Sequence, residues 1–503
     1  MEIAAAIRVV FATIRQRPAQ LFPFYLLALS VPAIVRVFSF IGVGLALGYL
    51  YIGGYLEAFQ QELATIDTSP PDPETDPEAF LEWVEGLQPL AETIVTPTTV
   101  MLLAISILLS VIVMILLYAA VSAGQFGTCF GLLQGDNGII RGIRGFRNYW
   151  LQFLGLYVLE FLLWVLITGS ILTVILLSAA FSLTLALFVG IFAVLIWLGL
   201  AIAIRAVFVF APVAVVVDDT SVTGSLRASV SFIRAEFGNA VIYYVIAIGT
   251  LLAWSGVSST LATVGAPTVA ALGSFLIIAP FLDLLKTVLF GDYRGEITPF
   301  ESPDRSIIQQ ASTGTKRGVF TMGEFVRSTP GLHAVTLGIV LIGFWMGWVL
   351  IEPLTEYLEA SIRARIAGII PPSAALNFFT NNWMVGMTLA FSGLAFAIPT
   401  VAGLWFNGFV FGMYGHLEAE PLVLLAFVIP HGIFEIPAIL ISGALGLYLG
   451  LVFWRVWRGT IETEAFADIL ERAVWILVGI GVLIAIAAVI EGFFSPFYFR
   501  VFL

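Results

Sequence analysis

The sequence is dominated by apolar stretches, each long enough to cross a lipid bilayer. A helix of about 20 apolar residues spans the hydrocarbon core. Of the 503 residues, 60% are hydrophobic and 11% are charged, which is far from the composition of a soluble globular chain. Because a backbone in lipid must satisfy its own hydrogen bonds, long apolar stretches favour α-helices. We therefore expect an all-α, polytopic integral membrane protein.

The apolar stretches predict about 11 transmembrane helices. In the first half of the chain they lie at about 21–51, 100–123, 149–172, 183–204, 241–259 and 269–290. In the second half they lie at about 333–351, 383–397, 400–414, 422–454 and 474–490. The stretches on either side of Pro399 are short, so we expect broken or re-entrant helices in the C-terminal half.

A polar stretch separates the two groups of apolar stretches. Residues 291–329 hold charged side chains among Ser, Thr and Gly, a composition typical of linkers. We interpret residues 1–290 as an N-terminal membrane domain, residues 291–329 as a cytoplasmic linker and residues 330–503 as a C-terminal membrane domain. Residues 1–20 place Ile, Val and Phe on one helical face beside arginines, which predicts an interfacial helix.

The distribution of charge predicts the orientation in the cell membrane. Arginines cluster at 141–147 and again at 205–234, whereas the loop at 57–92 holds acidic residues and no basic residue. Basic residues favour the cytoplasmic side. We therefore expect a multi-pass protein of the cell membrane with a cytoplasmic N-terminus, an acidic outer loop and a C-terminus outside.

Charged residues also fall inside predicted spans of the N-terminal domain. They are Arg36, Glu160 and Asp283. An ionised group at membrane depth needs a partner, and Arg36 or Arg205 can supply one for Glu160. We interpret these charges as buried ion pairs or snorkelling arginines in preference to a transport path.

The usage of cysteine, lysine and acidic residues limits the kind of organism and the kind of partner that we expect. The single cysteine, Cys129, excludes an intrachain disulfide and a cysteine-based zinc cluster. Only Lys286 and Lys316 are lysines, and acidic residues give a net charge of −11. This usage is typical of a halophilic archaeon, although a high-GC genome also favours arginine over lysine. An excess of negative charge argues against nucleic acid as a partner, because phosphate contacts need clustered basic residues.

The C-terminal domain contains an ionisable pair in an otherwise apolar stretch. His431 and Glu435 are four residues apart and therefore share one face of a helix. Pro430 and Pro437 flank the pair and restrict where that helix can run unbroken. Ionisable groups at membrane depth are costly and mark a functional site by default.

This motif carries a resemblance to a known family. Pro430-His431-Gly432 with Glu435 and Pro437-Ala438, preceded by Asn407-Gly408 and Asn381-Asn382, resembles the signature of the stage II sporulation protein M family. The resemblance extends from about Met322 to the end of the chain. It implies a polytopic membrane domain without enzymatic activity, since the family takes its name from a sporulation complex that remodels the cell envelope with a wall hydrolase.

A second resemblance concerns the N-terminal domain. The stretches 208–212, 217–219 and 225–229 are similar to a motif in membrane domains of uncharacterised prokaryotic proteins, including domains fused to glycerophosphodiester phosphodiesterases. This resemblance implies a membrane-embedded unit of six helices and no particular chemistry.

Several roles stay open for the polar site of His431, Glu435, Asn407, Gly408, Asn382, Pro430 and Gly432. The side chains can lock helix packing by bonding to one another, or dock a helix of another membrane protein. They can bind a metal, with His416 or an asparagine as a third ligand, although no HExxH motif is present. They can also form a proton relay in a transporter.

The sequence therefore predicts a non-enzymatic membrane component of an envelope-associated complex, acting as a scaffold or docking protein. A transporter or lipid-handling protein that uses His431 and Glu435 is the alternative. No nucleotide-binding motif is present, and we expect no cofactor. The expected partners are membrane lipids and envelope proteins, and a homo-oligomer is compatible with the sequence.

Overall fold

The computed structural model describes residues 1–63, 65, 76–297, 305–355, 358, 360–362 and 370–495. Helices make up almost all of this part of the chain, and one isolated bridge pairs Ala360 with Glu418. The predicted all-α class is confirmed. Parts of the predicted acidic loop, of the linker and of the C-terminal end lie outside the described residues.

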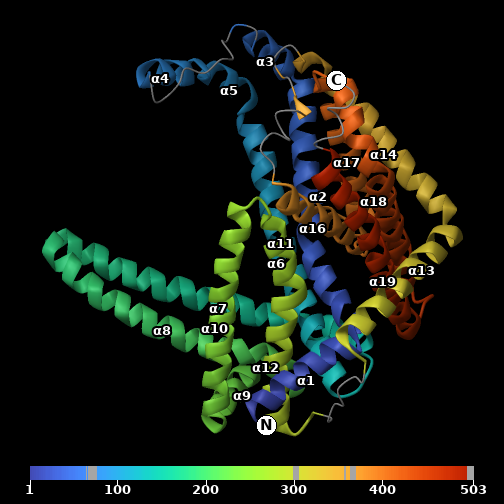
Figure 1. Cartoon of the computed structure of the whole chain (residues 1–503). Helices are drawn as coiled ribbons and strands as arrows, with labels where there is room; N and C mark the ends of the chain where they lie inside the picture. The colour runs from blue at the N-terminus through green and yellow to red at the C-terminus, as the bar shows by residue number, and fades with distance from the viewer. Residues whose placement is uncertain are drawn as a thin grey trace.

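The helices of the N-terminal half bundle around two long helices, α2 and α6 (Figure 1). Their bounds are α1 Ile3–Gln16, α2 Pro18–Ile52, α3 Tyr55–Leu63, α4 Pro77–Gly86, α5 Gln88–Ile94, α6 Pro97–Leu133, α7 Gly138–Phe181, α8 Leu183–Val217, α9 Val222–Ala235, α10 Phe237–Thr263, α11 Pro267–Gly273, the π-helical turn η1 Ser274–Ile278 and α12 Ala279–Arg294.

The C-terminal half forms a second group of helices beside α2 (Figure 1). Their bounds are α13 Ile307–Ser328, α14 Pro330–Ile351, the short 3₁₀ turn η2 Glu352–Leu354, α16 Pro371–Ser392, α17 Ile398–Leu417, α18 Pro421–Trp457, α19 Thr463–Val489 and the π-helical turn η3 Ile490–Phe494. The polar stretch predicted as a linker contains α13, whose side chains Met322 and Phe325 join the buried core.

Nine helices within the described residues are long and apolar enough to cross a membrane. They are α2, α6, α7, α8, α10, the combined α11–η1–α12, α14, α18 and the combined α19–η3. Nine of the about 11 expected spans coincide with these helices. The stretches at 383–397 and 400–414 fall in α16 and α17, which are not among the nine. Asparagine, threonine, glycine and His416 make these two helices less apolar.

The chain turns sharply between α16 and α17. Phe396 and Ala397 both have positive φ angles, of 57° and 63°, and Pro399 lies in the first turn of α17. Proline is well tolerated there because the first helical N–H groups have no partner within the helix. The break predicted at Pro399 is present, and it turns α17 back toward α14 (Figure 1).

The amphipathic helix predicted at the N-terminus is α1, which crosses one end of the bundle (Figure 1). Its Phe11 ring lies 5.8 Å from that of Phe281 on α12, and the N-terminal ammonium group pairs with Asp292. The short helices α3, α4 and α5 lie at the opposite end (Figure 1).

Helices α7 and α8 form a long antiparallel hairpin that projects sideways from the bundle (Figure 1). Apolar side chains are exposed along both helices, and Phe181 and Leu183 at the tip are the most exposed of them. Trp164 and Trp197 pack together with ring centroids 5.9 Å apart. Exposed apolar surface on all sides is what a helix needs in contact with lipid.

The pair α14 and α17 is joined by glycines on both helices. A methyl group on Gly408 would collide with the backbone carbonyl of Val340, and one on Gly347 would collide with the carbonyl of Phe409. Gly343 and Gly412 extend the same contact, so each helix carries two glycines four residues apart. Small residues at this spacing let membrane helices pack backbone to backbone.

We predict that Gly408→Ala destabilises the protein by about 1–3 kcal/mol, because the new methyl group overpacks the contact with α14. Thermal unfolding in detergent micelles measures the effect. Gly338→Ala on α14 is the matched control, since a methyl group at that position would have no atom within 4 Å, and it should leave the midpoint unchanged or slightly raised. Equal midpoints for the two variants would contradict the proposed contact.

Candidate functional site

His431 and Glu435 lie on α18, which runs unbroken through Pro430 and Pro437. His431 is ten residues from the helix start, or about 15 Å along the axis at 1.5 Å per residue. Each proline removes one backbone donor, so the carbonyls of Ala426 and Ile433 lose their helical partners. The two prolines therefore cause a local loss of backbone hydrogen bonds, and they do not interrupt the helix.

The His431 side chain is 6% exposed and is held by contacts on two sides. Its Nδ1 atom lies 3.3 Å from the hydroxyl oxygen of Ser495, which follows η3. The ring also hydrogen-bonds to the backbone of Phe427 and meets the Phe427 ring edge-on, with centroids 5.3 Å apart. These contacts fix the orientation of the imidazole.

Two carboxylates lie beside the imidazole. Glu435 is one turn further along α18, and Glu491 comes from η3, directly after α19. One ligand atom from each of His431, Glu435 and Glu491 lies within 4.8 Å of the others. We call these three residues the His431 cluster.

Glu491 was missed by the sequence reasoning. The signal for it is the position of an acidic residue immediately after the long apolar run that ends Val489-Ile490. A carboxylate at the edge of a predicted span is normally read as a solvated end. Only the fold shows that this edge meets the face of α18 that carries His431.

The other polar residues of the predicted site make contacts of their own. Asn407 donates from Nδ2 to the carbonyl of Gly403 on its own helix, at 2.7 Å. Asn382 accepts a hydrogen bond of 3.0 Å from Asn381 at an exposed position. His416 stacks on Trp348 with ring centroids 4.6 Å apart. Among the histidine, cysteine, aspartate and glutamate side chains of the described residues, Glu491 is the one that groups with His431 and Glu435, so the third acidic or histidine ligand is Glu491 and not His416.

The remaining motif residues shape the packing around the cluster. Gly408 packs against the backbone of α14, whereas Gly432 is buried and its nearest neighbours are Val428 and Ile436 on its own helix. A small apolar cluster of Ile362, Val423 and Phe427 packs at the first turns of α18. The backbone N–H of Ile362 donates to the carboxylate of Glu418 at 2.9 Å.

A second polar centre is buried in the N-terminal half. Asp283 accepts hydrogen bonds from the Tyr25 hydroxyl at 3.0 Å and pairs with the Lys286 ammonium at 2.9 Å. The Lys286 ammonium also lies 4.7 Å from the centre of the Phe126 ring. The Tyr25 hydroxyl lies 3.5 Å from the Cys129 sulfur. Lys286 was missed as the partner of Asp283, although one of only two lysines in the chain lies one turn further along the same helix.

Of the other charged residues in predicted spans, Glu160 forms an ion pair and Arg36 is exposed. Glu160 on α7 pairs with Arg205 on α8 at 2.6 Å, so the predicted pairing with Arg205 is present. This ion pair joins the two helices of the hairpin. Arg36 is exposed on the surface of α2, where a long side chain can reach the edge of a membrane.

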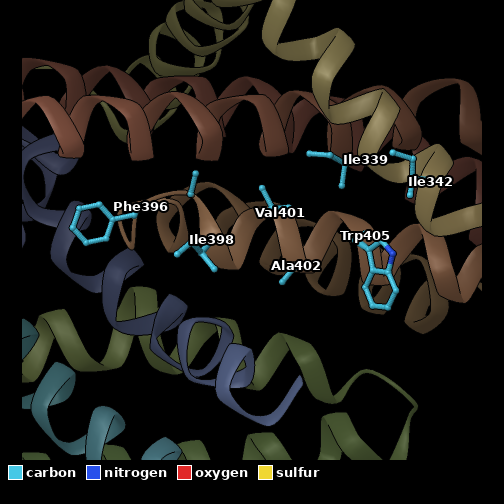
Figure 2. A pocket seen from close by; sticks show the side chains of 8 residues that line it. Ile339, Ile342, Phe396, Ile398, Val401, Ala402 and Trp405 are labelled. Atoms are coloured by element: carbon cyan, nitrogen blue, oxygen red, sulfur yellow. The ribbon is translucent and has the colours of Figure 1, made fainter. Parts of the chain in front are cut away.

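An open apolar groove of about 500 Å³ lies between α14 and α17 (Figure 2). Its walls come from α14, from the turn before α17 and from the first turns of α17. The lining residues are Ile339, Ile342, Phe396, Ala397, Ile398, Val401, Ala402 and Trp405. The Trp405 indole N–H donates to the sulfur of Met346 at 3.4 Å, and the surface that the groove offers a ligand is largely apolar.

Comparison with known proteins decides the family of the C-terminal domain. The model of the family "Stage II sporulation protein M" matches residues 336–496. The chain belongs to the stage II sporulation protein M family. The resemblance carried by the His431 motif is therefore confirmed, and the domain comprises most of α14 to η3.

One curated relative is an uncharacterized protein of Methanocaldococcus jannaschii. It is 32% identical over 173 residues, which make up 32% of this chain and 92% of the relative. No solved structure matches the chain. The family match therefore includes His431, Glu435 and Glu491.

We predict that the buried pair of Asp283 and Lys286 is strongly coupled in stability. Lys286→Met or Asp283→Asn alone should cost about 3–5 kcal/mol, because each leaves its partner buried without an opposite charge. The double variant should cost clearly less than the sum of the two single variants. Unfolding of all four proteins in one detergent gives the coupling energy, and simple additivity would show that the two groups act independently.

Proposed function

We propose that the protein is a non-enzymatic membrane scaffold of an envelope-associated complex, in which the stage II sporulation protein M domain holds transmembrane helices of partners. The proposal rests chiefly on the way α2 packs on this domain. Leu26 and Leu29 of α2 share one buried cluster with Met387 of α16 and Leu470 of α19. Here the domain binds a transmembrane helix from outside the matched family region.

Aromatic and polar contacts extend this interface. Phe40 of α2 and Phe406 of α17 pack with ring centroids 5.3 Å apart. Thr268 of α11 donates to the side chain of Asn377 on α16 at 2.7 Å and lies 2.6 Å from the hydroxyl of Thr380. Interhelical hydrogen bonds of this kind stabilise helix association in lipid.

The relative from Methanocaldococcus jannaschii supports a docking role. The aligned 173 residues are nearly the whole relative but about a third of this chain. That protein therefore has no room for a counterpart of the other two thirds. A unit that occurs both alone and joined to further helices is suited to recognising helices from other chains.

The groove between α14 and α17 offers a second face for a partner. It lies on the family domain and its lining is apolar, so side chains of a partner helix can fill it without leaving a polar group unpaired. The tight glycine contact between α14 and α17 gives the groove rigid walls. A rigid apolar groove favours docking over a moving gate.

The His431 cluster favours the alternative of a transporter or lipid-handling protein. An imidazole and two carboxylates at membrane depth can pass protons or bind a cationic headgroup. The groove can also accept an acyl chain. These observations support the alternative. An experiment on the groove distinguishes a scaffold from a transporter or lipid-handling protein.

We predict that a photo-crosslinking residue at Ala402, inside the groove, captures a defined membrane protein in native membranes. The same residue at Val245, an exposed apolar position on α10, should give lipid adducts alone and serves as the control. Ala402→Trp should fill the groove and abolish co-purification of that protein, whereas Val245→Trp should not. Lipid adducts alone at Ala402 would reject the scaffold and favour the lipid-handling alternative.

We further propose a cell-membrane location with the N-terminus in the cytoplasm and the C-terminus outside. The proposal is supported by the segregation of charge along the bundle. Arginines gather at the end that carries α1, where Arg15 donates to Gln310 at 3.3 Å and Arg17 to the carbonyl of Asp136 at 2.9 Å. The acidic helices α3, α4 and α5 lie at the other end (Figure 1), as the preference of basic residues for the cytoplasm predicts.

The single buried cysteine makes this orientation easy to test. Cys129 is free and buried, so a membrane-impermeant maleimide should not label the wild-type protein in intact cells. We predict labelling of Glu85→Cys on α4 and none of Ser312→Cys on α13 until the cells are permeabilised. The reverse pattern would invert the orientation.

A further inference from the structure

The His431 cluster has the composition of a cation site. Its ligand atoms are one imidazole nitrogen and two carboxylate oxygens, all within 4.8 Å of one another. They come from two separate elements, α18 and η3. Glu435 and Glu491 are far apart in sequence. The fold brings them together, and the four-residue spacing of His431 and Glu435 on one helix does not account for the third ligand.

The charges of the cluster call for a counter-ion. Two neighbouring carboxylates repel each other, and partial burial raises the cost of keeping both ionised. A neutral imidazole contributes no charge. One divalent cation would neutralise both carboxylates at once and would satisfy the cluster at membrane depth.

The contacts of His431 also fit a metal ligand. Nδ1 faces the hydroxyl of Ser495, which is fully buried, and the ring hydrogen-bonds to the backbone of Phe427. When Nδ1–H donates to such an oxygen, the lone pair lies on Nε2. Metal-binding histidines are oriented in this way by a partner on the other nitrogen.

The donor set selects the kind of cation. Calcium and magnesium prefer six or more oxygen ligands, whereas zinc readily combines imidazole with carboxylates. Zinc bonds of about 2.0–2.2 Å place neighbouring ligand atoms about 3.3 Å apart in a tetrahedron. Modest rotation of the Glu435 and Glu491 side chains closes the difference from 4.8 Å.

We propose that His431, Glu435 and Glu491 bind one divalent transition-metal cation, for which zinc is the best fit. The cation joins the middle of α18 to the segment that follows α19. Three protein ligands leave a fourth position for water. This site goes beyond the scaffold function and does not depend on it, because the groove between α14 and α17 contains none of the three ligands.

The test uses the full-length protein, purified in detergent through a tag without histidine and stripped with a chelator. Elemental analysis after equilibration with zinc should find one equivalent bound, and competition with a chromophoric chelator gives the Kd. Glu435→Gln and Glu491→Gln keep the side-chain shape and should each weaken binding at least about tenfold. His416→Ala, which removes a histidine outside the cluster, is the matched control and should bind as wild type.

Folding is checked separately by the unfolding midpoint without metal, which should be similar in all four proteins. Zinc should raise the midpoint of wild type and His416→Ala but not of the two glutamine variants. Zinc binding that is absent from wild type, or equal in wild type and both glutamine variants, would overturn the proposal. The crosslinking result at Ala402 would stand in either case.

Discussion

Helices in lipid gain little from the hydrophobic effect when they associate, because lipid tails are as apolar as their side chains. Association then depends on close backbone contact and on pairing of polar groups. The C-terminal domain meets this constraint with glycines. Gly343 and Gly347 face Gly408 and Gly412 across α14 and α17, while a methyl group on Gly393 would collide with the backbone of Gly446 on α18. The rest of the domain, including the groove and the position of α18, follows from these contacts.

The N-terminal half uses polar pairing more than glycine contact at its centre. Asp283 gathers Tyr25 and Lys286 from two helices, and Glu160 and Arg205 tie the α7–α8 hairpin. Between that ion pair and its tip, the hairpin packs on few other helices within the described residues. Its exposed apolar side chains are suited to contact with lipid. The two halves therefore differ in how they satisfy the same constraint. One is a closely packed domain, and the other is a core with an extended lipid-facing arm.

Much of this architecture could be predicted from the apolar stretches, since each of the nine candidate spans coincides with one of them. The count differs at α16 and α17, because both are long enough to cross but their polar residues make them less apolar than the nine candidate spans. The motif located His431 and Glu435, since an ionisable pair in an apolar helix is visible locally. It could not locate Glu491, because only the packing of α19 on α18 brings that carboxylate to the cluster. Lys286 was missed for a different reason: a lysine near the end of a span normally needs no partner.

The groove and the His431 cluster lie in different parts of the family domain. The groove lies on α17 and α14, whose glycine contact makes them a rigid pair. The His431 cluster lies between α18 and η3, where Pro430 and Pro437 have already removed backbone hydrogen bonds from α18. Contacts between α18 and η3 compensate for the lost hydrogen bonds. The side chains of the His431 cluster provide such contacts. Because α18 also packs on α17, with Leu404 against Gly443, a restraint on α18 steadies the helix that forms one wall of the groove. The motif that identifies the family thus lies where it can stabilise the groove without forming part of it.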